Sequence, residues 1–315
     1  MKKLFLILML AASSVTAQTY PSKPIRLIVG FPPGGSADPT TRIMGQALQE
    51  QMGQPVIVEN RPGADGAVAA EQMVRLPADG YTLMFASNSS MTAAVALRKQ
   101  PLYDPLADFT PVSLVGRATV ILYVHPAVPA KTLKEFIEHA RANPGKLNYG
   151  TGNPLSILYN AQLINATGID MVHVPYKGEG PLNPDILTGR VQSAFLSTGT
   201  AVSYAKDGRL RALAVLLKER SPLLPEVPTI DEAGVPEVSV RQWAGIFGPP
   251  GLPREIVQRL NKEVNAALQR TDVREKLLSY GYAAEGSTPE RLLEINRDDL
   301  ALWRKLVKEA GIPLE

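Results

Sequence analysis

Residues 25–39, IRLIVGFPPGGSADP, decide the fold of this chain. The apolar run 25–29 is typical of a buried strand, and the residues after Asp38 have the apolar spacing of a helix. Asp38 is expected to cap that helix, with Pro39 as its first residue, where a missing N–H costs nothing. The segment therefore predicts a strand, a glycine-rich turn and the start of a helix.

The turn has the features of an anion site. Free N–H groups and the helix dipole favour an anion, and Gly34 and Gly35 let a ligand approach the backbone closely. Gly30 and Gly35 have the spacing of a phosphate-binding loop, but Ser36 stands where that loop needs lysine. A nucleotide is therefore not expected, whereas a carboxylate fits. A capped turn without a ligand explains this loop, taken alone, equally well.

The first seventeen residues are expected to be a cleavable signal peptide. Lys2 and Lys3 precede the apolar run 4–12, which is too short to span a bilayer comfortably, and Ala17 suits the position before a cleavage site. The predicted location is the periplasm. The chain has no cysteine, and its formal charge of +3 falls when Lys2 and Lys3 leave. Neither nucleic acid nor a membrane surface is an expected partner.

Strand and helix patterns alternate along the rest of the chain. Strands are expected at 25–29, 56–59, 82–86, 112–115, 120–124, 147–150, 172–176, 191–196 and 210–215. Helices are expected at 38–52, 66–75, 133–143, 156–167, 180–188, 203–207, 253–270, 273–280 and 289–310. This order favours an α/β fold with parallel sheets covered by helices, and ligands of such sheets bind beyond the carboxyl ends of the strands.

Small polar residues follow four of these strands. They are Ser36; Ser87 and Ser89; Thr151, Asn153 and Ser156; and Ser197 and Thr198. Such groups donate hydrogen bonds without fixed charge, and a hydrogen bond to a charged group contributes about 1.5–3 kcal/mol. Turns and caps explain any one of these loops. Four loops at the same kind of place favour a binding site for a small anion.

No catalytic or metal-binding pattern is found. His125, His139 and His173 lack metal-ligand spacing, and His173 is expected to pack inside an apolar strand. A nucleophile elbow, G-x-S-x-G, is also absent from the sequence. We therefore expect no enzymatic activity, no cofactor and no metal.

The mature chain resembles the Bug-type receptors of tripartite tricarboxylate transporters, a family of periplasmic solute-binding proteins. The stretches that carry the resemblance are YPSKPI at 20–25, GGSAD at 34–38, VENRPGA at 58–64, ADGYT at 78–82, DF at 108–109, NPGKL at 143–147, VPYKG at 174–178, VPTIDEAG at 227–234, WAG at 243–245 and PPGLP at 249–253. One of these stretches alone is weak, but their order and spacing are specific.

The resemblance implies a type II-like periplasmic binding protein with two α/β lobes, a ligand cleft between them and a two-strand hinge. The crossings are expected near 119–125 and 238–247. One lobe would combine 18–122 with 244–315, and the other would be 123–243, after a signal peptide of 1–17.

The resemblance also implies that the first glycine-rich loop holds a ligand carboxylate through backbone amides and ordered waters. Matching positions give Gly34, Gly35, Ser36, Asp38, Ser87, Ser89, Thr151, Asn153, Ser156, Lys177 and Gly178 as ligand-binding residues. The strand-end pattern adds Ser197 and Thr198, and Phe31 is added as an apolar edge of the cleft. Arg42 is expected in a surface ion pair instead.

Three departures from the family pattern bear on the ligand. Pro154 removes an amide donor from a loop that also lacks the family's histidine. Ser193 and Leu196 stand in a strand that often carries acidic residues, which weakens the case for an amino acid. Phe31 and Leu155 make the cleft edge apolar. We therefore expect a mono- or dicarboxylate with an apolar or aromatic body.

The function implied is capture of this carboxylate by a monomeric receptor and its delivery to membrane permease subunits. One alternative is a sensor that presents its ligand to a membrane kinase. Another is an exported enzyme built on a binding-protein fold.

Overall fold

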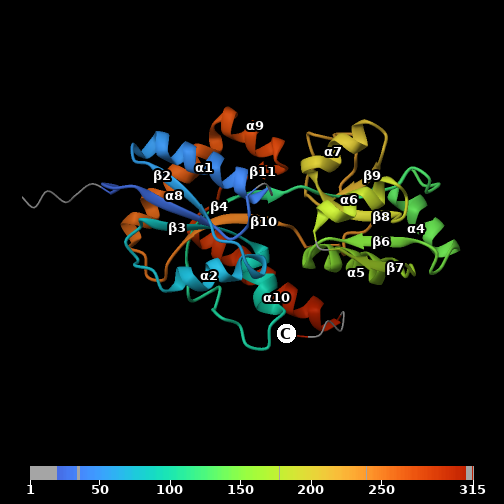
Figure 1. Cartoon of the computed structure of the whole chain (residues 1–315), viewed down its shortest axis with the longest axis horizontal. Helices are drawn as coiled ribbons and strands as arrows, with labels where there is room; N and C mark the ends of the chain where they lie inside the picture. The colour runs from blue at the N-terminus through green and yellow to red at the C-terminus, as the bar shows by residue number, and fades with distance from the viewer. Residues whose placement is uncertain (1–19, 34–35, 177, 239, 310–313, 315) are drawn as a thin grey trace, which may run out of the picture.

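The computed structural model describes residues 20–33, 36–176, 178–238, 240–309 and 314. The expected signal peptide, Gly34, Gly35 and Lys177 lie outside these ranges. The described chain forms two β-sheets, each with helices on both faces, side by side along the long axis of the molecule (Figure 1). Within these ranges, every helix is too short or too polar to cross a membrane.

The first sheet has six strands in the order β11-β4-β10-β3-β1-β2. Their bounds are β1 Ile25–Val29, β2 Val56–Asn60, β3 Thr82–Ser87, β4 Thr110–Ala118, β10 Trp243–Gly248 and β11 Tyr282–Ala284. Leu27 and Val29 of β1 pack on one face with α1 (Ala37–Met52), α8 (Arg254–Gln269) and α9 (Thr271–Ser279). Ile28 points to the other face, against α2 (Ala67–Val74), as the two-residue period of a strand requires. The short η1 (Ala64–Gly66), the π-helical η2 (Ser89–Ala93), α3 (Ala94–Ala96) and α10 (Pro289–Glu309) complete this part.

The second sheet has five strands in the order β7-β6-β8-β5-β9. Their bounds are β5 Val120–Val124, β6 Asn148–Thr151, β7 Val172–Pro175, β8 Ser193–Ser197 and β9 Arg211–Val215. Core residues of α4 (Leu133–Ala142) and α5 (Pro154–Thr167) pack together in one cluster. Those of α6 (Glu179–Leu187) and α7 (Thr198–Lys206) form another with β5 and β8. The predicted α/β class is confirmed.

The prediction of parallel sheets is correct for part of each sheet only. β1, β2 and β3 are parallel, as are β6, β7 and β8, but β10 runs antiparallel to β3 and β4, and β5 runs antiparallel to β8 and β9. β11 also runs antiparallel to β4. Of these strands, β5 and β10 are the ones by which the chain enters each sheet from the other. Such strands enter from the neighbouring sheet and not from a covering helix, so the right-handed crossover that makes neighbours parallel does not apply to them.

The chain passes from the first sheet to the second at Thr119, the one residue between β4 and β5. Its N–H donates to the carbonyl of Gly281 (2.7 Å), beside the first sheet, and its carbonyl accepts from the N–H of Thr198 (3.2 Å), beside the second. Thr119 is therefore tied to both sides of the passage. The lobe limits of 18–122 with 244–315 and 123–243 remain a prediction.

Candidate ligand-binding site

Three loops of the first sheet meet beyond the carboxyl ends of β1, β2 and β3. A Cβ atom on Gly30 would lie 2.6 Å from Cα of Gly66, and one on Gly66 would lie 3.0 Å from Cβ of Ser90 and 3.6 Å from the Phe31 ring. Both positions therefore need glycine for the loops to approach. This packing places Phe31 against the loop that follows β2.

The carboxylate of Asp38 is held by neighbouring side chains. Asn60 Nδ2 donates to Oδ1 (2.8 Å), while Arg42 donates from Nε to Oδ2 (3.2 Å) and has Nη2 2.9 Å from Oδ1. The surface ion pair expected for Arg42 is therefore present. These contacts join the start of α1 to the end of β2.

The prediction that Asp38 caps α1 is wrong. The helix begins at Ala37 with Ser36 at the cap position, so Asp38 and Pro39 both lie inside the first turn. The Ser36 carbonyl accepts from the N–H (3.3 Å) and the hydroxyl (2.7 Å) of Thr40, which starts the helix two residues earlier than expected. Asp38 still benefits from the positive end of the helix dipole.

Ser87 ends β3 and Ser89 begins η2. Ser87 is buried, and its hydroxyl has no hydrogen-bond partner among the described residues. Its backbone N–H donates to Ser90 Oγ (3.4 Å), and its carbonyl accepts from that same hydroxyl (3.1 Å). The polar end of β3 is thus hydrogen-bonded to the helical turn that follows it.

The loop after β6 is a capping box. Asn153 Oδ1 accepts from the N–H of Ser156 (2.9 Å), and Ser156 Oγ accepts from the N–H groups of Gly152 (3.1 Å) and Asn153 (3.2 Å). The Ser156 hydroxyl is therefore used in starting α5. Thr151, Gly152 and Asn153 of this segment line the cavity described below.

The prediction that His173 packs inside an apolar strand is wrong. His173 lies exposed on the edge strand β7, stacks on Tyr149 with ring centroids 5.1 Å apart, and has Nε2 2.7 Å from Thr151 Oγ1. The prediction failed because β7 is at the edge of its sheet, and the sequence of a strand does not say how many neighbours it has. Partial burial lowers the pKa of His173.

A cavity of about 460 Å³ opens where the two sets of loops face each other. Its lining residues are Asp65 from the first sheet's side and Thr151, Gly152, Asn153, Ile157, Pro175, Tyr176 and Gly178 from the second. Among the described residues proposed from sequence, Thr151, Asn153 and Gly178 line it. The others of that set, Phe31, Ser36, Asp38, Ser87, Ser89, Ser156, Ser197 and Thr198, lie outside its lining.

Close backbone packing shapes the wall of this cavity. A Cβ atom on Gly152 would lie 2.7 Å from the carbonyl carbon of Gly178 and 2.8 Å from the nitrogen of Glu179. The loops after β6 and β7 can touch only because residue 152 has no side chain. Tyr176 completes this wall, and its hydroxyl donates to Asp185 Oδ2 (2.7 Å).

The residues proposed from sequence did not include five that line the cavity, namely Asp65, Gly152, Ile157, Pro175 and Tyr176. They also did not include Glu179, which lies next to the lining residue Gly178. Asp65 has a φ of 53° in the run from Gly63 to Gly66, both of which also have positive φ. Two glycines around an Asp were the available signal, since Asp tolerates this conformation. Nothing in the local sequence marked Glu179, whose role depends on a strand eighteen residues further along.

Glu179 reaches the carboxyl end of β8. Its Oε1 accepts from the N–H of Ser197 (3.1 Å) and its Oε2 from the Ser197 hydroxyl (2.7 Å). Burial raises the pKa of Glu179, and the two hydrogen bonds from Ser197 partly offset that rise. The next residue, Thr198, is buried, and its hydroxyl has no partner among the described residues.

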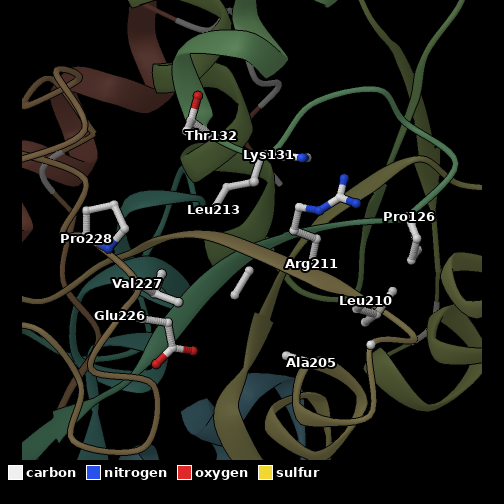
Figure 2. Close-up of a pocket in the computed structure, with 12 residues that line it drawn as sticks. Pro126, Lys131, Thr132, Ala205, Leu210, Arg211, Leu213, Glu226, Val227 and Pro228 are labelled. Carbon is white, nitrogen blue, oxygen red and sulfur yellow. The ribbon is translucent and has the colours of Figure 1, made fainter.

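Another cavity, of about 490 Å³, lies along β9 on the second sheet (Figure 2). It contains none of the residues proposed from sequence. The Arg211 guanidinium donates from Nη1 to the carbonyls of Val128 (3.1 Å) and Ala130 (2.6 Å), so this cation is engaged in holding the loop before α4. The strand-end cavity is therefore the better candidate for a ligand.

Comparison with known proteins gives one consistent family. A family model described as the tripartite tricarboxylate transporter family receptor matches residues 40–312. BugT of Bordetella pertussis is 36% identical over 310 residues, which cover 96% of this chain and 94% of BugT. The family description names a receptor and no enzymatic activity.

Two solved structures share the fold and carry ligands in their descriptions. Rpa4515 of R. palustris, with adipate, has a TM-score of 0.81 and 32% identity, covering 93% of this chain and 99% of that one. MatC (Rpa3494) from Rhodopseudomonas palustris, with bound malate, has a TM-score of 0.76 and 31% identity, covering 91% and 100%. The predicted two-lobe binding-protein fold is confirmed, and the chain belongs to the receptor family of tripartite tricarboxylate transporters.

Proposed function

We propose that this protein captures an organic mono- or dicarboxylate in the periplasm and delivers it to the permease subunits of a tripartite tricarboxylate-type transporter. The observation that carries the proposal is the cavity at the carboxyl ends of both sets of strands, lined mostly by neutral polar and small residues. That is where ligands of α/β sheets bind. Two similar proteins hold adipate and malate, which are both dicarboxylates.

The first-sheet loop supplies the proposed carboxylate cradle. Gly34, Gly35 and Ser36 precede α1, where backbone N–H groups and the helix dipole attract an anion. Ser87, Ser89 and Thr198 are proposed to add neutral donors from neighbouring strand ends. Asp65 is the one acid among the described lining residues, so an anionic group is expected to bind away from it.

The opposite wall offers apolar contact. Ile157, Pro175 and Tyr176 line it, and Phe31 lies on the first-sheet side. A carboxylate with an apolar or aromatic body fits these contacts, because the body gains burial while the carboxylate keeps its hydrogen bonds. Lys177 and Gly178, at the end of β7, are proposed to contact the ligand from the second sheet.

A thermal-shift screen of the chain without residues 1–17 tests the proposal against aliphatic and aromatic mono- and dicarboxylates, amino acids and neutral diols. A ligand at a hundred times its Kd stabilises the folded state by about 2.7 kcal/mol, which raises the melting temperature. We expect a shift with one class of carboxylate. Shifts with neutral diols alone would contradict the proposal.

Two glycine variants locate the site. Gly152→Ala forces apart the loops after β6 and β7, so we expect it to abolish most of the shift, whereas Gly180→Ala meets no atom within 4 Å and should preserve it. Equal shifts in both variants would place the ligand elsewhere. Mass spectrometry of the denatured protein identifies any acid that co-purifies and distinguishes capture from turnover.

A further inference from the structure

Glu179 lies directly behind the wall of the candidate cavity. It follows Gly178, which lines the cavity, and its nitrogen is next to Gly152 on the facing loop. From this position its side chain crosses to the end of β8, where both carboxyl oxygens accept from Ser197. Glu179 thus contacts the loop after β6 through its backbone and the end of β8 through its carboxyl group.

Among the described residues, the hydrogen-bond partners of this carboxyl group are polar and uncharged. The only partners that lower its pKa are the N–H and hydroxyl of Ser197, and no lysine or arginine of the described chain is among them. Tyr123 and Tyr159 both feel its charge, and their buried hydroxyls have no hydrogen-bond partner among the described residues. Partial burial of a carboxylate among neutral groups costs free energy.

Tyr159 connects this group to the first-sheet side. Its hydroxyl feels the charges of Glu179 as well as those of Asp299 and Arg241, which belong to α10 and to the segment before β10. The buried Tyr159 hydroxyl is therefore within electrostatic range of Glu179 on the second-sheet side and of Asp299 on the first-sheet side. A charged group of a ligand held between the two sides would lie within a similar range of Glu179.

We propose that Glu179 determines ligand specificity, by accepting a hydrogen bond from a hydroxyl or ammonium group of the ligand and by repelling a second carboxylate. This inference rests on the proposed function. The ligand class it names is a monocarboxylate whose other end carries a donor. The Ser197 contacts fix the orientation of the carboxyl group, and each oxygen keeps acceptor capacity beyond the single hydrogen bond it receives from Ser197.

The rival explanation is a structural brace, in which Glu179 only ties α6 to β8. Loss of a structural brace lowers the stability of the folded protein and weakens the binding of all ligands equally. A specificity residue changes the ratio between matched ligands instead. Burial raises the pKa of Glu179, so the comparison is made at several pH values, because only the ionised group repels a second carboxylate.

Isothermal titration calorimetry measures the ratio of affinities between matched ligands, and we use two ligand series. The first is hexanoate, its terminal hydroxy and amino derivatives, and adipate; the second is benzoate, para-hydroxybenzoate and terephthalate. We expect the wild-type protein to prefer the hydroxy or amino acid over the dicarboxylate. Glu179→Gln should reduce this preference by about ten- to a hundredfold, mostly through weaker binding of the donor-bearing ligand. Glu138→Gln, on the exposed face of α4, is the matched control and should leave the preference unchanged.

Ser197→Ala provides a second variant that keeps the carboxyl group. This variant removes one internal hydrogen-bond donor to Glu179, so a specificity role predicts that the preference for the donor-bearing ligand is kept or increased. A structural brace predicts that Glu179→Gln and Ser197→Ala both lower stability and both leave the ratio of ligand affinities unchanged. If wild-type protein binds these acids and Glu179→Gln has the same ratio, the inference is wrong and the proposed function stands. If hexylamine or hexanediol binds and no carboxylate does, the proposed function is wrong and the inference falls with it.

Discussion

Asp299 of α10 is a buried carboxyl group surrounded by neutral donors. Trp243 Nε1 donates to its Oδ2 (3.2 Å), and Thr92 Oγ1 lies 2.8 Å from the same oxygen. Burial raises the pKa of Asp299 to about 6, and these hydrogen bonds offset only part of that rise. The folded protein therefore holds the Asp299 proton more tightly than the unfolded chain does.

The sign of the resulting pH dependence is the reverse of the usual carboxylate case. Because the folded pKa is above the unfolded value of 3.8, the contribution of Asp299 to the free energy of unfolding is fully present below that value. It falls by up to about 3 kcal/mol as the pH rises through about 6. Asp299→Asn keeps a neutral group at this position, so the variant should gain stability relative to wild type over this range.

Urea unfolding at several pH values between about 4 and about 7, followed by the fluorescence of the buried Trp243 and Trp303, measures this difference. Other carboxyl groups titrate in both proteins, so only the difference between the two proteins reports on Asp299. A difference that stays constant across the range would show that Asp299 is ionised in the folded protein throughout.

Asp38→Asn tests a residue whose partners are all on the protein. Both carboxylate oxygens are engaged by Asn60 and Arg42, so the charge serves the start of α1. We expect a loss of about 1 kcal/mol in unfolding free energy, because Arg42 is half-exposed and its pairing is partly screened. Ligand affinity should change by less than about threefold, since a neutral amide can keep the Asn60 contact. A loss of tenfold or more, measured by calorimetry, would place Asp38 on the ligand.

At the scale of elements, the turn between α9 and β11 packs against the start of α7. Gly281, with a φ of 84°, would place a Cβ atom 1.9 Å from Thr198 Oγ1, while its carbonyl binds the N–H of Thr119. Gly281→Ala should therefore combine a backbone penalty of about 1–2 kcal/mol with about 1–3 kcal/mol of overpacking. The combined loss should appear as a lower urea midpoint.

Gly208→Ala separates the two contributions. Gly208 has a similar φ of 71° but would place its Cβ atom against no other atom within 4 Å, so only the backbone penalty remains. Adding Thr198→Ala to Gly281→Ala should restore part of the stability, because the closest contact is with the threonine hydroxyl. Equal losses for the two single glycine variants would mean that α7 moves away without cost.

Much of the fold at this scale follows from local pattern. The period of apolar residues predicted β1 and β5 with their observed bounds and most helices within a few residues. It did not predict β11 or the helical turns from Ser89 to Ala96, which are short and depend on neighbouring elements. Strand direction was also missed, since a strand that enters from another sheet looks locally like one that follows a helix.

The residues at the candidate site also divide into those that a local sequence rule could predict and those that it could not. Thr151, Asn153 and Gly178 lie at or just beyond the ends of β6 and β7. Strand ends are where α/β folds place ligands, so the sequence could predict these residues. Asp65 and Glu179 could not be found by that rule. Asp65 depends on a left-handed backbone, and Glu179 acts at the end of a strand to which it is not adjacent in sequence.

At the scale of the molecule, the two sheets are joined through Thr119 and through the return that leads into β10. The candidate cavity has lining residues on both sides of this connection. A ligand that contacts both sides gains most when they approach, so binding should shift the population toward a closed form. This expectation concerns distances across the molecule, which can be measured directly.

The absence of cysteine makes labelling specific. Ile57→Cys on β2 and Val172→Cys on β7 place dyes at exposed positions on edge strands of the two sheets, at opposite ends of the molecule (Figure 1). Saturation with a carboxylate found in the thermal-shift screen should raise energy transfer between them. Ile57→Cys with Tyr280→Cys, both beside the first sheet, is the matched control and should show no change. The first pair could instead show unchanged energy transfer although the ligand still raises the melting temperature. That result would mean that the ligand binds in a site that is already formed. The permease would then have to recognise the ligand itself and not a surface created by closure.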